Sequence, residues 1–197
     1  MKEIWAIILA AGASTRMNRQ KLLLPFNGKT IIETVVENVI QSVNSNVMVV
    51  LGSHREQIRE QIANYPVQFC VNENYLNGML SSVICGFRAL PEESKAALIF
   101  LGDQPQIPSS ATDLVIKAWI QSKKGIVMPM FNGRRGHPAL IETRYKTEIE
   151  SLDPEKGLRA LAEKFKDDVY EVDCNIPEIL RDIDTPEEYQ FEINKNQ

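Results

Sequence analysis

The sequence predicts an α/β protein of three layers, α/β/α, with a mostly parallel sheet between two layers of helices. Continuous apolar runs of strand length occur at residues 4–9, 47–51 and 96–101, and such runs are typical of strands buried on both faces. Segments with apolar residues at helical spacing separate these runs, and this alternation favours parallel strands. A length of 197 residues suits one domain with a large core, so we expect a single domain over residues 1–197.

The other elements continue the alternation. Further strands are expected at residues 67–71, 125–130, 138–141 and 169–173. Helices are expected at residues 30–43, 53–63, 78–90, 110–122, 144–152, 156–166 and after 185. In the helix at 78–90 we expect five apolar side chains to face inward: Met79, Leu80, Val83, Ile84 and Phe87.

Local signals mark several boundaries. Three helix starts carry a Ser or Thr three residues before a Glu, the pattern of a capping box: Thr30 with Glu33, Ser53 with Glu56, and Thr185 with Glu188. The dipeptide Asn132-Gly133 predicts the turn of a hairpin between the strands at 125–130 and 138–141. That hairpin would interrupt the β-α alternation.

Composition excludes several classes of protein. Apolar residues make up 44% and charged residues 24% of the chain, and the net charge is −4, so we expect no nucleic-acid partner and no membrane partner. The three cysteines show no metal-ligand or disulfide-framework spacing, which indicates a reducing, cytoplasmic location. The apolar run that begins at Ile4 is interpreted as a buried strand rather than a signal peptide, since Glu3 precedes it directly.

The stretch that follows the first strand is a candidate anion site. Residues 10–15 are small, and Gly12 allows backbone N–H groups to approach a ligand closely. Successive N–H groups in such a loop form a concavity that binds anions. Arg16 and Lys21 add positive charge suited to a triphosphate. The alternative is an ordinary turn between a strand and a helix, with a solvated basic flank.

Asp103 is the candidate metal ligand. It follows a buried strand, and a carboxylate there can hold Mg²⁺ together with substrate phosphates. The alternative is a turn residue that caps the backbone before Pro105. Ligands of parallel sheets bind at the carboxyl ends of the strands, so the loops at 10–21, 72–82 and 102–106 are expected to meet at one edge.

Three further groups are candidates with simpler alternatives. Residues 78–82 open a helix with free N–H groups and hydroxyls that suit a base or ribose, although Ser is common in first turns. Residues 134–138, with two arginines and a histidine, suit an anionic second substrate or merely form a charged turn. Asp182 and Asp184 either face the metal or compensate the dipole of the last helix.

Several motifs occur together and in one order: LAAGASTRM…KLLLPFNGKT at 9–30, NGMLSSV at 77–83, LGDQP at 101–105, GRRGHP at 133–138, GLR at 157–159 and DIDTPE at 182–187. Together they resemble the molybdenum cofactor cytidylyltransferases and their relatives, the MobA-like nucleotidyltransferases. The resemblance spans nearly the whole chain. One departure is Asn18, where the family usually has Gly after Arg-Met.

The resemblance implies a nucleotide-diphospho-sugar transferase fold, GT-A-like and Rossmann-like. It implies Mg²⁺-dependent transfer of CMP from CTP to the phosphate of molybdopterin, with release of pyrophosphate. The LAAG form favours CTP over GTP. The nucleotide would be held by Leu9, Ala10, Ala11, Gly12, Arg16, Lys21, Gly78, Ser81 and Ser82. Catalysis would use Lys21, Arg16 and Asp103, with Asp103 and Asp184 on the metal. The acceptor would contact Arg135, Gly136, His137 and Arg159.

Two other functions remain open at this stage. One is a nucleotidyltransferase that uses GTP, or whose acceptor is a sugar phosphate or polyol phosphate. The other is a non-catalytic accessory protein that carries the molybdenum cofactor to a molybdenum hydroxylase or its chaperone. No Ser/His/Asp or Cys/His pattern is present, so a transferase of this kind is expected to let the acceptor phosphate attack the α-phosphorus directly.

Overall fold

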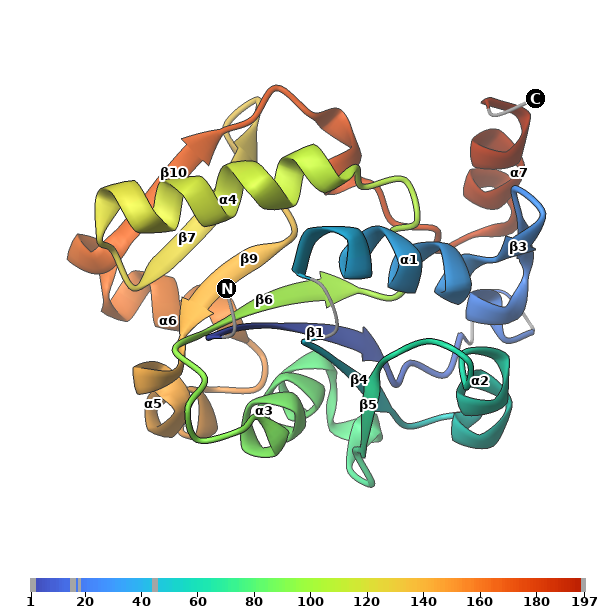
Figure 1. The fold of residues 1–197 in the computed structure, drawn as a ribbon, viewed down its shortest axis with the longest axis horizontal. Coiled ribbons are helices and arrows are strands. Elements are labelled where there is room, and N and C mark those ends of the chain that lie inside the picture. Colours follow the sequence, from blue (N-terminus) through green and yellow to red (C-terminus); the bar gives the residue numbers. More distant parts are fainter. Residues whose placement is uncertain (1–2, 15–16, 18, 44–45, 196–197) are drawn as a thin grey trace.

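An eight-stranded sheet forms the middle layer, and helices cover both of its faces (Figure 1). The computed structural model describes residues 3–14, 17, 19–43 and 46–195. The strand order is β10-β7-β9-β6-β1-β4-β5, and the short strand β8, which is not part of this order, pairs with β7. The predicted three-layer α/β class with a mostly parallel sheet is confirmed. Among the described residues, no helix is long and apolar enough to cross a bilayer.

The bounds agree closely with the predicted ranges. The strands of the main sheet are β1 (Ile4–Ala10), β4 (Val47–Leu51), β5 (Gln68–Val71), β6 (Ala96–Leu101), β7 (Ile126–Phe131), β8 (Arg134–Arg135), β9 (Ala139–Glu142) and β10 (Val169–Asp173). A separate small ribbon contains β2 (Pro25–Phe26) and β3 (Lys29–Thr30). The helices are α1 (Ile31–Val43), α2 (Arg55–Gln61), α3 (Met79–Ala89), α4 (Ser109–Ser122), α5 (Lys146–Glu150), α6 (Leu158–Lys164) and α7 (Pro186–Lys195).

Alternate residues of β1 enter two different cores. Ala6 and Ile8 pack with α1, α2 and α4 on one face of the sheet. Ile7 packs with α3, α5 and α6 on the other face. Successive side chains of a strand point to opposite faces, so a strand buried on both faces must be apolar throughout. This is the physical reason for the continuous apolar runs of the sequence.

The predicted hairpin is confirmed. Asn132 and Gly133 have φ of 48° and 73°, and the chain reverses there into β8 and then β9. β9 runs antiparallel to both β6 and β7, whereas β6, β1, β4 and β5 are mutually parallel. The hairpin therefore adds two antiparallel strands, β8 and β9, to an otherwise parallel sheet.

Two capping boxes are confirmed and one is wrong. Thr30 and Glu33 exchange side-chain bonds to each other's backbone N–H, with distances of 2.8 and 3.3 Å. The same exchange joins Thr185 and Glu188. At the third site, α2 begins after His54, which adopts φ 55° and makes no side-chain cap. The Ser53 hydroxyl lies 2.7 Å from His54 Nδ1, so it does not cap the helix.

The inward orientation predicted for Met79 is also wrong. Met79 is 58% exposed, whereas Leu80, Val83 and Phe87 are buried. Met79 is the first residue of α3, where the helix meets the carboxyl edge of the sheet, and it lines a pocket there. That pocket is the candidate site.

Candidate active site

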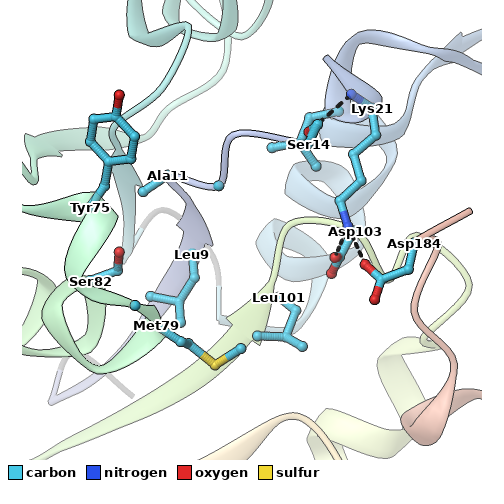
Figure 2. A pocket seen from close by; sticks show the side chains of 13 residues that line it. Leu9, Ala11, Ser14, Lys21, Tyr75, Met79, Ser82, Leu101, Asp103 and Asp184 are labelled. Atoms are coloured by element: carbon cyan, nitrogen blue, oxygen red, sulfur yellow. Dashed lines mark hydrogen bonds and ion pairs between the residues drawn. The ribbon is translucent and has the colours of Figure 1, made fainter. Parts of the chain in front are cut away.

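The carboxyl ends of β1 and β6 lie side by side because these strands pair in parallel register, with Leu9 opposite Leu101. The Gly102 N–H donates to the Leu9 carbonyl at 3.0 Å, which joins the two loops that follow. A pocket of about 310 Å³ opens between them (Figure 2). Its lining residues are Leu9, Ala11, Gly12, Ser14, Lys21, Leu22, Tyr75, Gly78, Met79, Ser82, Leu101, Asp103 and Asp184. The loops after β1, β5 and β6 therefore meet at one edge, as the sequence predicts.

The loop after β1 folds back on itself. Ser14, with φ 52°, donates from Oγ to Gln20 Oε1 at 2.6 Å and accepts from the Lys21 N–H at 3.2 Å. These bonds place Lys21 at the start of a 3-10 helix whose first side chain enters the pocket. Space is open beside Gly12, where an added Cβ would meet no atom of the described residues within 4 Å.

Not every residue predicted for the nucleotide lies on the pocket. Leu9, Ala11 and Gly12 line it, whereas the Ala10 side chain is buried in the core below. Arg16, together with Asn18, lies outside the described residues.

Lys21 bridges two carboxylates at one end of the pocket. Its ammonium lies 2.5 Å from Asp103 Oδ2 and 2.7 Å from Asp184 Oδ1 (Figure 2). Burial by itself lowers the pKa of Lys21, but the two carboxylates outweigh burial and raise it. The lysine is therefore charged. The other oxygen of Asp103, Oδ1, is buried and makes no hydrogen bond within the described part of the chain.

The two aspartates before α7 have different environments. The Ile183 N–H donates to the Asp103 carbonyl at 3.1 Å and docks this segment beside the loop after β6. Asp184 faces Lys21, whereas Asp182 accepts from Gln104 Nε2 at 2.7 Å. Burial and then the nearby charge of Asp103 raise the pKa of Asp182. The structure thus brings Asp184, and not Asp182, onto the Lys21 ammonium.

This end of the pocket suits a divalent cation. The carboxylates of Asp103 and Asp184 are hard oxygen donors of the kind that Mg²⁺ or Mn²⁺ takes with help from substrate phosphates, and the buried Oδ1 of Asp103 makes no hydrogen bond to the described residues. Among the described residues, no group of three or more His, Cys, Asp or Glu side chains could hold a metal alone. Water molecules or substrate oxygens would therefore complete the coordination sphere.

The opposite end of the pocket is less charged. Figure 2 shows Tyr75, Met79 and Ser82 across the pocket from Lys21. Gly78 precedes α3 with φ 88°, a conformation that favours glycine. The Ser81 hydroxyl donates to the Asn74 and Gly78 carbonyls, so it stabilises the turn, while Ser82 lines the pocket.

The residues predicted for the acceptor line a second pocket of about 660 Å³. It contains Arg135, Gly136, His137 and Arg159, which come from the hairpin and from α6. Gly136 packs so closely that an added Cβ would lie 2.5 Å from the Ile179 carbonyl. His137 Nδ1 lies 3.1 Å from the Ile99 carbonyl, and desolvation lowers the pKa of its imidazole. The charge of Asp103 acts on His137 and partly opposes that shift, so the two sites are within electrostatic reach of each other.

Sequence reasoning missed Ser14 and Tyr75. Ser14 lies in the motif at 9–30, but its αL conformation could not be inferred from residue type. Tyr75 belongs to a 3-10 helix, Tyr75–Asn77, in a segment predicted only as a polar loop.

The comparisons with known proteins place this chain among the nucleotidyltransferases. Residues 6–169 match the model of the MobA-like NTP transferase domain, and the chain belongs to this family. It is 30% identical to the molybdenum cofactor cytidylyltransferase of Escherichia coli (strain K12), over 96% of this chain and 95% of that protein. It is 26% identical to nicotine blue oxidoreductase of Paenarthrobacter nicotinovorans, over 94% of each.

Solved structures agree on the fold. The crystal structure of Rv0371c from Mycobacterium tuberculosis H37Rv superposes with a TM-score of 0.86 at 23% identity, over 98% of this chain and 97% of that chain. A complex of Rv0371c with manganese superposes with a TM-score of 0.80, over 98% of each chain.

Proposed function

We propose that the enzyme transfers CMP from CTP to the phosphate of a molybdopterin-type acceptor and releases pyrophosphate. The observation that carries this proposal is the Lys21 ammonium held between Asp103 and Asp184 beside an anion-binding loop. Such a constellation can receive a metal and a triphosphate together. The similarity to a cytidylyltransferase over 96% of the chain supports the choice of CTP.

The protein would act by positioning and charge neutralisation. Backbone N–H groups near Gly12 would receive the triphosphate, and Gly78 and Ser82 would receive ribose and base. Lys21 would leave the carboxylates and donate to a phosphate oxygen, where it offsets the charge that builds on pyrophosphate. Arg16 is proposed to assist it. A divalent cation, Mg²⁺ in this proposal, would be held by Asp103 and Asp184 and would neutralise charge on the phosphates. The manganese complex of Rv0371c, which has the same fold, supports the proposal of a divalent cation.

The second pocket would hold the acceptor. Arg135 and Arg159 can contact anionic groups. The neutral imidazole of His137 donates from Nδ1 to the Ile99 carbonyl, so its Nε2 can accept a hydrogen bond from the acceptor. Arg135 is now paired with Glu171 at 2.7 Å, so an anionic acceptor would compete with that carboxylate. The product would pass to a molybdenum hydroxylase or its chaperone, in the cytoplasm.

Pyrophosphate release tests the proposal. The enzyme is incubated with Mg²⁺, each of CTP, GTP, ATP and UTP, and either molybdopterin, a sugar phosphate or a polyol phosphate. We expect release above background only with molybdopterin, and fastest with CTP. Faster release with another base than with CTP, or release with another acceptor, would replace the substrate assignment. Nucleotide-independent binding of molybdopterin without any release would favour the accessory role.

A matched control separates chemistry from folding. Asp103→Asn keeps the shape of the side chain and removes its charge, so it should fold and lose pyrophosphate release. The chain also resembles a protein named an oxidoreductase, so a redox activity is tested in the same samples. We expect no change in the absorbance of added NADH.

A further inference from the structure

A pair of cysteines lies outside the nucleotide pocket. Cys70 on β5 and Cys85 on α3 have Sγ atoms 3.7 Å apart. Both are half-buried, and both line a separate open pocket of about 570 Å³. Cys174 is not part of this pair, because its thiol donates to the Met130 carbonyl at 3.3 Å. Small oxidants can therefore reach two adjacent thiols.

The two thiols have unequal acidity. The hydrogen bond between the two thiols lowers the pKa of Cys85, and the Arg88 guanidinium one turn along α3 lowers it further, against the opposing effect of burial. The same interaction with Cys85 raises the pKa of Cys70. The thiolate is the reactive form of cysteine, so Cys85 is the attacking group and Cys70 supplies the second sulfur.

We propose that Cys70 and Cys85 form a reversible disulfide in the presence of a peroxide, and that the disulfide weakens nucleotide binding. The Cys85 thiolate attacks hydrogen peroxide, the O–O bond breaks, and Cys85 sulfenic acid and hydroxide form. Cys70 then attacks the sulfenic sulfur, and water leaves as the S–S bond forms. One peroxide is reduced to two waters as two thiols are oxidised. A dithiol such as dithiothreitol reverses the reaction by exchange.

Bond formation must bring the two sulfur atoms together. They are 3.7 Å apart, whereas a disulfide needs about 2.05 Å. Rotation of the side chains supplies part of this approach, and in our proposal a shift of α3 relative to β5 supplies the rest.

This movement has a short route to the nucleotide pocket. Asn72, two residues after Cys70, donates to Ser81 Oγ at 2.8 Å and to Ser82 Oγ at 3.0 Å. Ser82 lines the nucleotide pocket and lies one turn before Cys85 on α3. A change in the spacing of α3 and β5 therefore alters the contacts that position Ser82.

Intact-mass analysis tests the disulfide without any assumption about the substrate. Cys174→Ser enzyme treated with hydrogen peroxide should lose two hydrogens and yield one cross-linked peptide that contains Cys70 and Cys85. Cys85→Ser should form no intramolecular disulfide. Cys70→Ser should stop at a sulfenic acid on Cys85 that dimedone traps. A reduced Cys174→Ser mass after peroxide, or cross-links between molecules only, would overturn the proposal.

Nucleotide affinity tests the coupling, which rests on the proposed function. Mg²⁺-CTP is titrated calorimetrically into reduced and oxidised Cys174→Ser, with the GTP, ATP and UTP complexes in parallel so that a wrong base assignment is recognised. We expect the dissociation constant of the bound nucleotide to rise roughly fivefold on oxidation, the effect of about one lost hydrogen bond, and dithiothreitol to restore it. Equal affinities in both states would overturn the coupling, even where mass analysis shows the disulfide.

Discussion

Replacement of Lys21 by methionine separates metal binding from catalysis. The ammonium lies 2.5 Å from Asp103 and 2.7 Å from Asp184, and these side chains are 18% and 35% exposed. Removing one partner of a fully buried ion pair costs about 3–5 kcal/mol. Because water reaches Asp184 and weakens the interaction, we expect a loss of about 2 kcal/mol here. A protein of this size loses about 2–4 °C in Tm per kcal/mol, so Tm should fall by roughly 4–8 °C.

The same variant should bind a divalent cation more tightly. In the wild type, Mn²⁺ must displace the Lys21 ammonium from Asp103 and Asp184, whereas Lys21→Met has no ammonium to displace. We expect Mn²⁺ to restore the Tm of Lys21→Met and to bind it more tightly in the absence of nucleotide, as measured by paramagnetic resonance titration. Turnover should nevertheless fall by about 10–100-fold, because a charge-assisted contact of about 1.5–3 kcal/mol to the phosphates is lost.

Lys21→Arg is the matched control for charge. It keeps a cation beside the carboxylates, so its Tm and its Mn²⁺ affinity should stay close to those of the wild type. An Mn²⁺ affinity of Lys21→Met no higher than that of the wild type would refute the reasoning that the lysine occupies the metal position.

Three further predictions follow from other contacts. Asp103→Ala should lose on the order of a hundredfold or more in kcat, because a bound metal supplies several kcal/mol at the transition state, and near-normal Mg²⁺-dependent turnover would contradict this. Gly86→Ala places a Cβ 2.6 Å from Ile7 Cγ2 in the core, so we expect the free energy of unfolding, measured in urea, to fall by about 1–3 kcal/mol. Gly12→Ala is the control, because its Cβ meets no described atom within 4 Å, and its free energy of unfolding should be near that of the wild type. Desolvation lowers the pKa of His137 in the folded state, so the unfolded chain binds a proton at a higher pH than the folded chain does. The free energy of unfolding should therefore fall as the pH drops through about 6.5, the pKa of an unperturbed His. His137→Gln should flatten this dependence, measured as urea midpoints between pH 7.5 and 5.5.

The sequence was informative where structure is decided by near neighbours. Continuous apolar runs predict the strands because both faces of β1 are covered. The capping box of Thr30 and Glu33 forms because its bonds span one helical turn. The box at Ser53 fails for a local reason as well, since His54 adopts the αL conformation and engages the Ser53 hydroxyl. Residue type alone does not distinguish these two outcomes.

The candidate site could be predicted only as far as the sheet edge. Parallel pairing of β1 and β6 brings Asp103 beside the loop after β1, which general rules for such sheets anticipate. The contact of Lys21 with Asp184 joins positions 163 residues apart, and it depends on how the segment before α7 docks on the loop after β6. No periodicity or spacing specifies that docking. The sequence therefore predicts Lys21, Asp103 and Asp184 as candidates without indicating that the lysine contacts both aspartates.

Anomalous diffraction from a crystal of the enzyme with Mn²⁺ and a non-hydrolysable CTP analogue would show whether Asp103, Asp184 and the loop after β1 hold a metal and a triphosphate together. We expect one manganese peak between the carboxylates of Asp103 and Asp184, a triphosphate along the loop after β1, and the Lys21 ammonium within hydrogen-bond distance of a phosphate oxygen. A manganese peak elsewhere, or a nucleotide bound while Lys21 still bridges both aspartates, would contradict it.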